Sequence, residues 1–304
     1  MKVKKSLIII ALLIMIGGCE EFLESTGITK SIIQQYFPLT VGAEWNYKIT
    51  STMYDETGTV PEDVYEITAT IRITETTTKS GVETYVLKII NLSFSELWEM
   101  DQEDISEINT FLESFKIFVA YSETGISLHG LEGYYESEYY SEYNDVTYYN
   151  EIDFQGFFTK GIVILPESIL AEEPIEGSGY LNYNSWDVDE STGEKISEYK
   201  DNYSFSVTTT LLEEKGSVSV TGGYFDDCRI VESTFSFTND WEDWDYVSDT
   251  YDSYSSTMSG SGKTYFAKGI GMVKAEISYD WGEAEDNAYM IKSVVVELIS
   301  YSGL

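Results

Sequence analysis

The stretch AEWNYKITSTM, residues 43–53, alternates between apolar and polar side chains. Successive side chains of a β-strand point to opposite faces, so a run of this kind predicts a strand with one buried face. The predicted buried face consists of Ala43, Trp45, Tyr47, Ile49 and Met53.

The two segments that follow also have strand patterns. Residues 65–74 alternate apolar with polar side chains, and residues 83–94 are apolar on both faces. Turn residues separate the three segments, DETG at 55–58 and KSG at 79–81. Three successive strands joined by short turns predict an antiparallel meander.

One segment has helical periodicity. Residues 101–115, DQEDISEINTFLESF, begin with an acidic turn that suits the positive end of a helix dipole. Their apolar side chains recur at intervals of three and four residues, and we expect the resulting stripe to pack on the sheet. The stripe consists of Ile105, Ile108, Phe111, Leu112 and Phe115.

The remainder of the chain again has β patterns. Residues 115–130 are typical of a hairpin that turns at Gly125, and His129 lies on its second arm. Further strand patterns continue to the C-terminal end, including one candidate strand over residues 264–281. The sequence therefore predicts a mainly β fold with one packed helix, in a single domain over residues 36–304.

The first 18 residues have the features of a secretory signal. Lysines at positions 2, 4 and 5 precede an apolar core over residues 7–16, which is too short to span a membrane. The sequence Ile16-Gly17-Gly18-Cys19 resembles the lipobox of bacterial lipoproteins. That resemblance implies cleavage between Gly18 and Cys19 and attachment of a diacylglycerol to the Cys19 thiol. An ordinary secretory signal with an incidental cysteine is the alternative.

Residues 19–35 lack a strong periodic pattern, and we interpret them as a lipidated tether. The expected location is the cell envelope, with the lipid holding the protein on the outer side of the cytoplasmic membrane or in the outer membrane. Because two or three acyl chains hold a protein durably, the expected partner of this segment is the membrane itself.

The composition is strongly acidic. The 304 residues have a formal net charge of −35, and loss of the three signal lysines leaves 15 basic against 53 acidic residues, or −38. Such a surface repels nucleic acid and anionic headgroups, so we expect no nucleic-acid partner.

The chain contains few residues for nucleophilic or zinc chemistry. With Cys19 lipidated, Cys228 is the one remaining cysteine and can form no intramolecular disulfide, and His129 is the one histidine. Zinc sites built on two or three histidines are excluded, and we interpret His129 as structural. We assign no catalytic residue, no metal site and no cofactor, and expect no enzymatic activity.

Three segments are biased towards acidic or aromatic residues. Residues 187–198 match part of a calcium-loop spacing, although threonine replaces the turn glycine and a hairpin turn at 191–195 explains the pattern better. Residues 240–252 contain five aspartates and one glutamate and favour a solvated acidic loop, and residues 133–150 are rich in tyrosine and glutamate and favour an exposed strand or loop.

Three motifs resemble those of a group of poorly characterised bacterial lipoproteins and exported proteins. Tyr36-Phe37-Pro38-Leu39 with Gly42, Trp45 and Tyr47 is similar to their Y-F-P-L-x-x-G-x-x-W-x-Y opening. Residues 223–228 (GYFDDC) and 265–274 (YFAKGIGMVK) resemble their G-x-F-x-D-C and Y-x-A-K-G-x-G-x-V-K segments. The resemblance implies a strongly curved antiparallel sheet or half-barrel, similar to the outer-membrane lipoprotein carriers, with one helix.

The same motifs have structural interpretations. Phe37, Leu39 and Trp45 would anchor the first strand in the core, with a turn at Gly42. Gly269 and Gly271 would kink or bulge one long strand, and Cys228 would be a small buried apolar residue.

Three functional hypotheses remain. The first is a non-enzymatic lipoprotein that binds a hydrophobic ligand in the concavity of the sheet or a protein partner. The second is a surface glycan-binding or adhesive module, assisted by calcium at the acidic and aromatic segments. The third is a hydrolase built on two carboxylates, which the sequence does not support with any motif.

Overall fold

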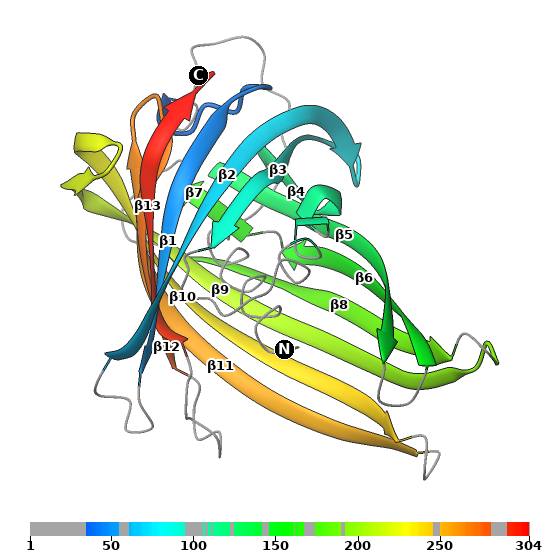
Figure 1. Ribbon diagram of the computed structural model, residues 1–304. Helices are drawn as coiled ribbons and strands as arrows, with labels where there is room; N and C mark the ends of the chain where they lie inside the picture. Colours follow the sequence, from blue (N-terminus) through cyan, green and yellow to red (C-terminus); the bar gives the residue numbers. More distant parts are fainter. Residues whose placement is uncertain are drawn as a thin grey trace.

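The computed structural model describes residues 35–54, 61–94, 106, 109–110, 112–121, 125–141, 146–160, 162–166, 174–189, 192–245, 250–280 and 291–303. These residues form one antiparallel sheet with very little helix (Figure 1). The strands are β1 (Glu44–Tyr54), β2 (Pro61–Lys79), β3 (Val82–Phe94), β4 (Lys116–Tyr121), β5 (Gly125–Ser141), β6 (Val146–Lys160), β7 (Ile162–Pro166), β8 (Ile175–Asp189), β9 (Lys195–Val220), β10 (Gly223–Asp245), β11 (Thr250–Ala267), β12 (Gly271–Asp280) and β13 (Ile291–Ser302).

The sheet curves until it nearly closes. Its strand order is β4-β3-β2-β1-β13-β12-β11-β10-β9-β8-β6-β5-β7, and β4 also pairs with β5. This extra pairing joins β4, the first strand of the order, to β5, the last but one, and the result is a nearly closed, barrel-like sheet. The predicted fold class, a mainly β fold with a curved antiparallel sheet, is confirmed, and the sheet closes further than a half-barrel. The assignment of residues 36–304 to a single domain stays a prediction.

Strand β1 has the alternation that its sequence predicts. Trp45, Tyr47 and Ile49 are each at most 3% exposed, and the residues between them are half-buried. Ser51 is also buried although it is polar. Side chains two residues apart in a strand point to the same face, so Ser51 points to the same face as Ile49. On the other face, Lys48 pairs with Glu66 of β2.

The segment before β1 closes one end of the core. Gly42 has a φ of 94°, as the predicted turn requires, and its N–H donates to the Ile73 carbonyl at 2.8 Å. The Phe37 and Trp45 rings stack with centroids 5.4 Å apart, and Phe37 also meets the edge of Phe266. The predicted anchoring of β1 by Phe37, Leu39 and Trp45 is therefore confirmed, since all three side chains are buried.

The predicted helix is short in the described part of the chain. Residues 106, 109–110 and 112–114 are helical, and the helix ends before Phe115, which is 1% exposed. Leu112 is 3% exposed and packs in the main core, as its place in the apolar stripe predicts. Ile105, Ile108 and Phe111 lie outside the described residues.

The interpretation of residues 264–281 as one kinked strand was wrong. This segment contains the end of β11 and all of β12, which pair antiparallel with Ala267 opposite Gly271. Gly269 has a φ of 78° and Gly271 a φ of 110°, values that reverse the chain in a tight turn. Positive φ at a glycine suits a turn as well as a bulge, and sequence alone did not separate the two.

Candidate functional site

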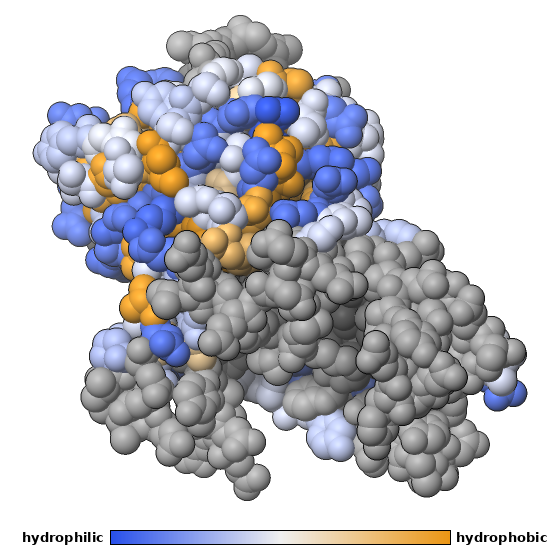
Figure 2. All heavy atoms as spheres, in the orientation of Figure 1, coloured by the Kyte–Doolittle hydropathy of each residue, from blue (hydrophilic) through white to orange (hydrophobic). Residues whose placement is uncertain are grey.

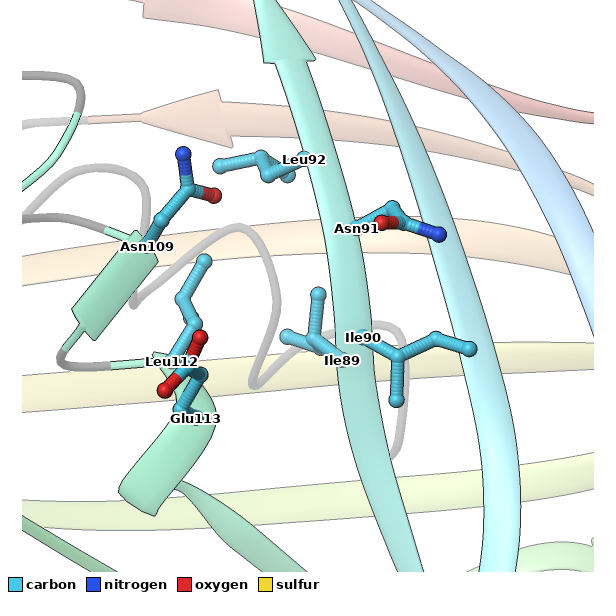
Figure 3. A pocket seen from close by; sticks show the side chains of 7 residues that line it. All are labelled: Ile89, Ile90, Asn91, Leu92, Asn109, Leu112 and Glu113. Atoms are coloured by element: carbon cyan, nitrogen blue, oxygen red, sulfur yellow. The ribbon is translucent and has the colours of Figure 1, made fainter.

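A pocket of about 200 Å³ lies between β3 and the helical residues 109, 112 and 113. Figure 3 shows Ile89 and Leu92 on the side of β3 that faces Asn109 and Leu112. Glu113 also lines the pocket and is exposed to solvent. The pocket therefore combines buried aliphatic side chains with an amide and a carboxylate from the helical segment.

A bulge in β3 shapes this pocket. Ile89 lies opposite Ile71 of β2, whereas Asn91 lies opposite Thr70, so Ile90 is an extra residue in the pairing. A single extra residue changes the alternation, which allows side chains three positions apart to share a face. Ile89 and Leu92 consequently both point towards the helical segment, and Ile90 and Asn91 lie on the other side of the strand (Figure 3).

The size of the pocket limits what it can hold. Pockets for whole small-molecule ligands are commonly about 300–1,000 Å³. A buried apolar cavity of roughly 150 Å³ holds one benzene ring. The pocket beside β3 is open to solvent and has more polar than apolar lining surface, so by size it suits a single ring that carries a polar group rather than a complete lipid.

Elsewhere the core face of the sheet is packed by the protein's own side chains. Trp45, Phe115 and Phe266 are each at most 1% exposed. Phe205, Phe235 and Phe237 form a second aromatic group, in which Phe205 and Phe237 stack at 5.4 Å. In these regions the described side chains, and not a ligand, fill the core.

A smaller buried cluster lies where β3, β4, β5 and β7 meet. Val86 is opposite Phe118, Ala120 is opposite Ser127, and Ser127 is opposite Val163. These side chains are buried but lie apart from the main core, so the sheet has apolar contacts on both faces here. The Ser127 hydroxyl is buried without a hydrogen-bond partner among the described residues.

His129 lies beside this cluster on β5, the second arm of the hairpin, where the sequence placed it. It is the extra residue between Leu128, which pairs with Val119, and Gly130, which pairs with Phe118. Its Nε2 is buried and has no partner within the described part of the chain, and burial lowers the pKa of the imidazole. His129 is therefore neutral near pH 7, as suits a structural residue.

The free energy of unfolding should fall in mild acid because of His129. The unfolded chain binds a proton near pH 6.5, whereas the folded imidazole with its lowered pKa does not. Stability due to this group is thus complete above about pH 6.5 and decreases as the pH falls below it. We expect urea unfolding at pH 7.5 and 5.5 to show a larger loss for the wild type than for His129→Gln.

The comparison with His129→Gln isolates one group. The chain has a single histidine, and its many carboxylates are common to both proteins, so their contribution cancels in the difference. Equal losses in the two proteins would contradict a buried, neutral His129.

Cys228 is buried, as the sequence predicts. It is 0% exposed, its Sγ donates to the Phe225 carbonyl at 3.7 Å, and burial raises the pKa of the thiol to about 11. A thiol with a raised pKa is a poor nucleophile at neutral pH. Cys228 therefore packs as an apolar residue beside Val231 and the rest of the main core.

The acidic segments lie on hairpins. Asp187 pairs with Ser197 and Val188 with Lys195, so the backbone at 187–198 turns from β8 into β9 as the hairpin interpretation requires. Residues 240–245 and 250–252 are the paired ends of β10 and β11 and not the loop that their composition favoured. In the described ranges, no three histidine, cysteine, aspartate or glutamate side chains group in a way that could hold a metal ion.

The tyrosine-rich segment is also strand. Residues 133–141 belong to β5 and residues 146–150 to β6, and the two strands pair with each other.

The structure does not describe the predicted anchor. The residues outside its described part include the signal segment 1–18, with Gly18 at its end, and residues 19–34 of the tether, which begin with Cys19. In the part that is described, no helix is long and apolar enough to cross a membrane.

Sequence reasoning placed Leu112 on a buried helical face and residues 83–94 in a strand, but it did not predict the pocket between them. The apolar pair Ile89-Ile90 was the available signal, because two adjacent apolar residues interrupt an alternating strand. It did not reveal which of the two faces the helix, since that depends on the register with β2.

Comparisons with known proteins give limited results. No family model and no curated protein matches this chain. Among solved structures it is similar to a "putative lipoprotein" from Parabacteroides distasonis, with 14% identity and a TM-score of 0.35, over 88% of this chain and 98% of that one. It is also similar to a "putative exported protein with YmcC-like fold" from Bacteroides fragilis, with 12% identity and a TM-score of 0.33, over 88% of this chain and 99% of that one. At these values the similarity carries no argument about function.

Proposed function

We propose that this chain is a lipid-anchored protein of the cell envelope that binds a small apolar group and has no enzymatic activity. The anchor in the proposal is Cys19, and the binding site is the pocket beside β3. The pocket carries the proposal, because it brings Ile89, Leu92 and Leu112 together beneath the amide of Asn109.

The dimensions of the pocket favour a protein partner or a small ring over a whole lipid. A partner could insert one apolar side chain, while the amide of Asn109 and the carboxylate of Glu113 bind polar groups around it. Most of the remaining core face is filled by the chain's own residues, which supports a binding site at the edge of the sheet rather than along its whole length.

The non-enzymatic part of the proposal is supported by the state of two residues. Cys228 is buried with a raised pKa, and its Sγ bonds within its own turn. His129 has a lowered pKa and lies four strand pairings away, on β5. These two residues do not form a nucleophile and base pair.

Indole is a suitable probe for the pocket, because it has one ring system and one N–H donor. We expect indole to raise the melting temperature of the wild-type protein, since a ligand that binds only the folded state stabilises it. Asn109→Trp should abolish this increase by placing a ring in the pocket. The melting temperature is followed by circular dichroism at several indole concentrations.

Asn202→Trp is the matched control, because Asn202 is exposed on β9 and the same ring there leaves the pocket open. This variant should respond to indole like the wild type. If indole left the melting temperature of the wild type unchanged, or raised that of Asn109→Trp equally, the pocket would not be the binding site.

A further inference from the structure

The root of the tether is fixed to one end of the sheet. The Gly269 N–H, in the turn between β11 and β12, donates to the Gln35 carbonyl at 2.5 Å. Tyr36 is 5% exposed, and the Arg229 guanidinium carbon lies 5.3 Å from the centre of its ring. The Leu39 N–H donates to the Tyr121 hydroxyl at 2.6 Å. The end of the sheet that contains the turn between β11 and β12 is therefore the end from which the tether leaves the domain.

Exposed apolar side chains gather at the same end. Val41 is 50% exposed, Tyr224 is 69% exposed and Tyr301 is 42% exposed. Tyr301 lies opposite Trp45 at the beginning of β1, just after the turn that contains Val41. The turn before Tyr224 is joined to the end of β13 by a bond from the Gly222 N–H to the Leu298 carbonyl at 2.8 Å. We call Val41, Tyr224, Lys268 and Tyr301 the tether-end surface; the C-terminal end of β13, the strand of Tyr301, is at the top of Figure 1.

Figure 2 shows how aliphatic and hydrophilic residues are distributed over one face of the molecule. On that face, orange side chains are small groups among hydrophilic ones. Val41 lies in the turn before β1, Tyr224 at the start of β10 and Tyr301 near the end of β13, and exposed apolar groups that gather in one place mark contact surfaces.

The charges of the protein are distributed unevenly along β10 and β11. At the tether end, the Lys215 Nζ donates to the Asp227 Oδ1 at 2.6 Å. This hydrogen bond and the positive charges of Lys215, Lys268 and Arg229 lower the pKa of Asp227. The opposite tips, at the lower right of Figure 1, contain Asp240, Glu242, Asp243, Asp245 and Asp252. No lysine or arginine occurs between Arg229 and Lys263 in the sequence. Lys200 of β9 lies opposite Glu242, so one lysine offsets part of the negative charge of this hairpin, and the rest of that charge lies far from the tether.

We propose that the tether-end surface contacts the headgroup region of the membrane that holds the lipid on Cys19. The proposal rests on the lipid anchor of the proposed function. A tyrosine has an apolar ring and a polar hydroxyl, which suits the boundary between hydrocarbon and water. The strongly acidic tips of β10 and β11 then point away from the bilayer, where repulsion from anionic lipids is weakest.

The short tether makes even a weak contact effective. Gln35 is the sixteenth residue after Cys19, and a flexible chain of sixteen residues has a root-mean-square span of roughly 20–24 Å. The tether-end surface is thus held at a high effective concentration near the bilayer, so a contact that would be undetectable in free solution is populated. Strand β11 has 18 residues and extends about 60 Å, so its far tip is out of reach of the headgroups in this orientation.

Site-specific fluorescence in vesicles tests the proposal. The full-length lipidated protein is placed in phosphatidylcholine vesicles that contain a lipid with a nitroxide quencher on its headgroup, and a fluorophore is attached to Tyr224→Cys or to Tyr254→Cys. Tyr254 is exposed near the far tip and is the matched control; Cys228 is buried and remains unlabelled. We expect the label at position 224 to lose most of its emission and the label at position 254 to keep it.

A second variant separates contact from mere proximity. A label at Val41→Cys should be quenched less when Tyr224→Asp and Tyr301→Asp are introduced together, although the protein still floats with the vesicles. Equal quenching at positions 224 and 254, or no effect of the two aspartates, would overturn the surface contact while leaving the anchor intact. If the protein failed to float with the vesicles at all, the lipid anchor itself would be wrong, and the contact with it.

Discussion

Trp45→Ala is expected to lower the free energy of unfolding by about 3–5 kcal/mol, the usual cost of removing a buried large aromatic side chain. Trp45 is 1% exposed, and its ring stacks on Phe37. Its Nε1–H donates to the Ile270 carbonyl at 2.6 Å, which joins β1 to the turn between β11 and β12. Alanine would leave a cavity and an unpaired carbonyl at one end of the core. Urea unfolding followed by far-ultraviolet circular dichroism measures the loss.

Two further variants show whether the loss comes from the core. Trp45→Phe keeps a ring on Phe37 but removes the N–H donor, and it should cost about 1–3 kcal/mol. Tyr301→Ala changes the residue directly opposite on β13, which is 42% exposed, and it should change stability by at most about 0.5 kcal/mol. A loss for Trp45→Ala as small as that for Tyr301→Ala would contradict the anchoring of β1 by this ring.

Local periodicity is sufficient to predict β1 and most of β2. Each strand has one face in the main core and one face in contact with water, so apolar and polar residues alternate along it. The alternation holds even at Ser51, which is buried because of its position and not because of its chemistry. Long-range packing confirms this local pattern without altering it.

Register and closure depend on contacts that a single segment does not contain. The pairing of β4 with β5 closes the order of the sheet, and the bulge at Ile90 depends on the alignment of β3 with β2. Likewise, Gly269 and Gly271 permit both a bulge and a turn. In the structure they form a turn, which hydrogen-bonds to the Gln35 carbonyl and to the Trp45 side chain. Such choices are made by tertiary packing, and the pattern of one strand leaves them open.

The candidate site was less predictable than the fold for the same reason. Leu112 and residues 83–94 were each assigned correctly from their own patterns, but a pocket exists only where two such elements meet. The exposed residues Val41, Tyr224 and Tyr301 are far apart in the sequence and have no common motif. They lie at the same end of the sheet because the turn before β1, the start of β10 and the end of β13 meet there.

Cys19→Ser is expected to remove the protein from the membrane fraction almost completely. A serine hydroxyl does not replace the thiol that receives the diacylglycerol, so neither the lipid nor the cleavage that follows it should occur. Durable anchoring needs two or more acyl chains, and the described residues contain no helix that could span a membrane in their place. Fractionation of cells, with incorporation of labelled palmitate, measures the effect.

Cys228→Ala is the control for this experiment, since it removes the other cysteine without altering the lipobox-like sequence. Its palmitate incorporation and membrane fraction should equal those of the wild type. Unchanged fractionation of Cys19→Ser would support the incidental cysteine instead. It would also leave Glu20 and the residues after it as an ordinary mature N-terminus, and the exposed tyrosines at the tether end would then need a partner other than lipid.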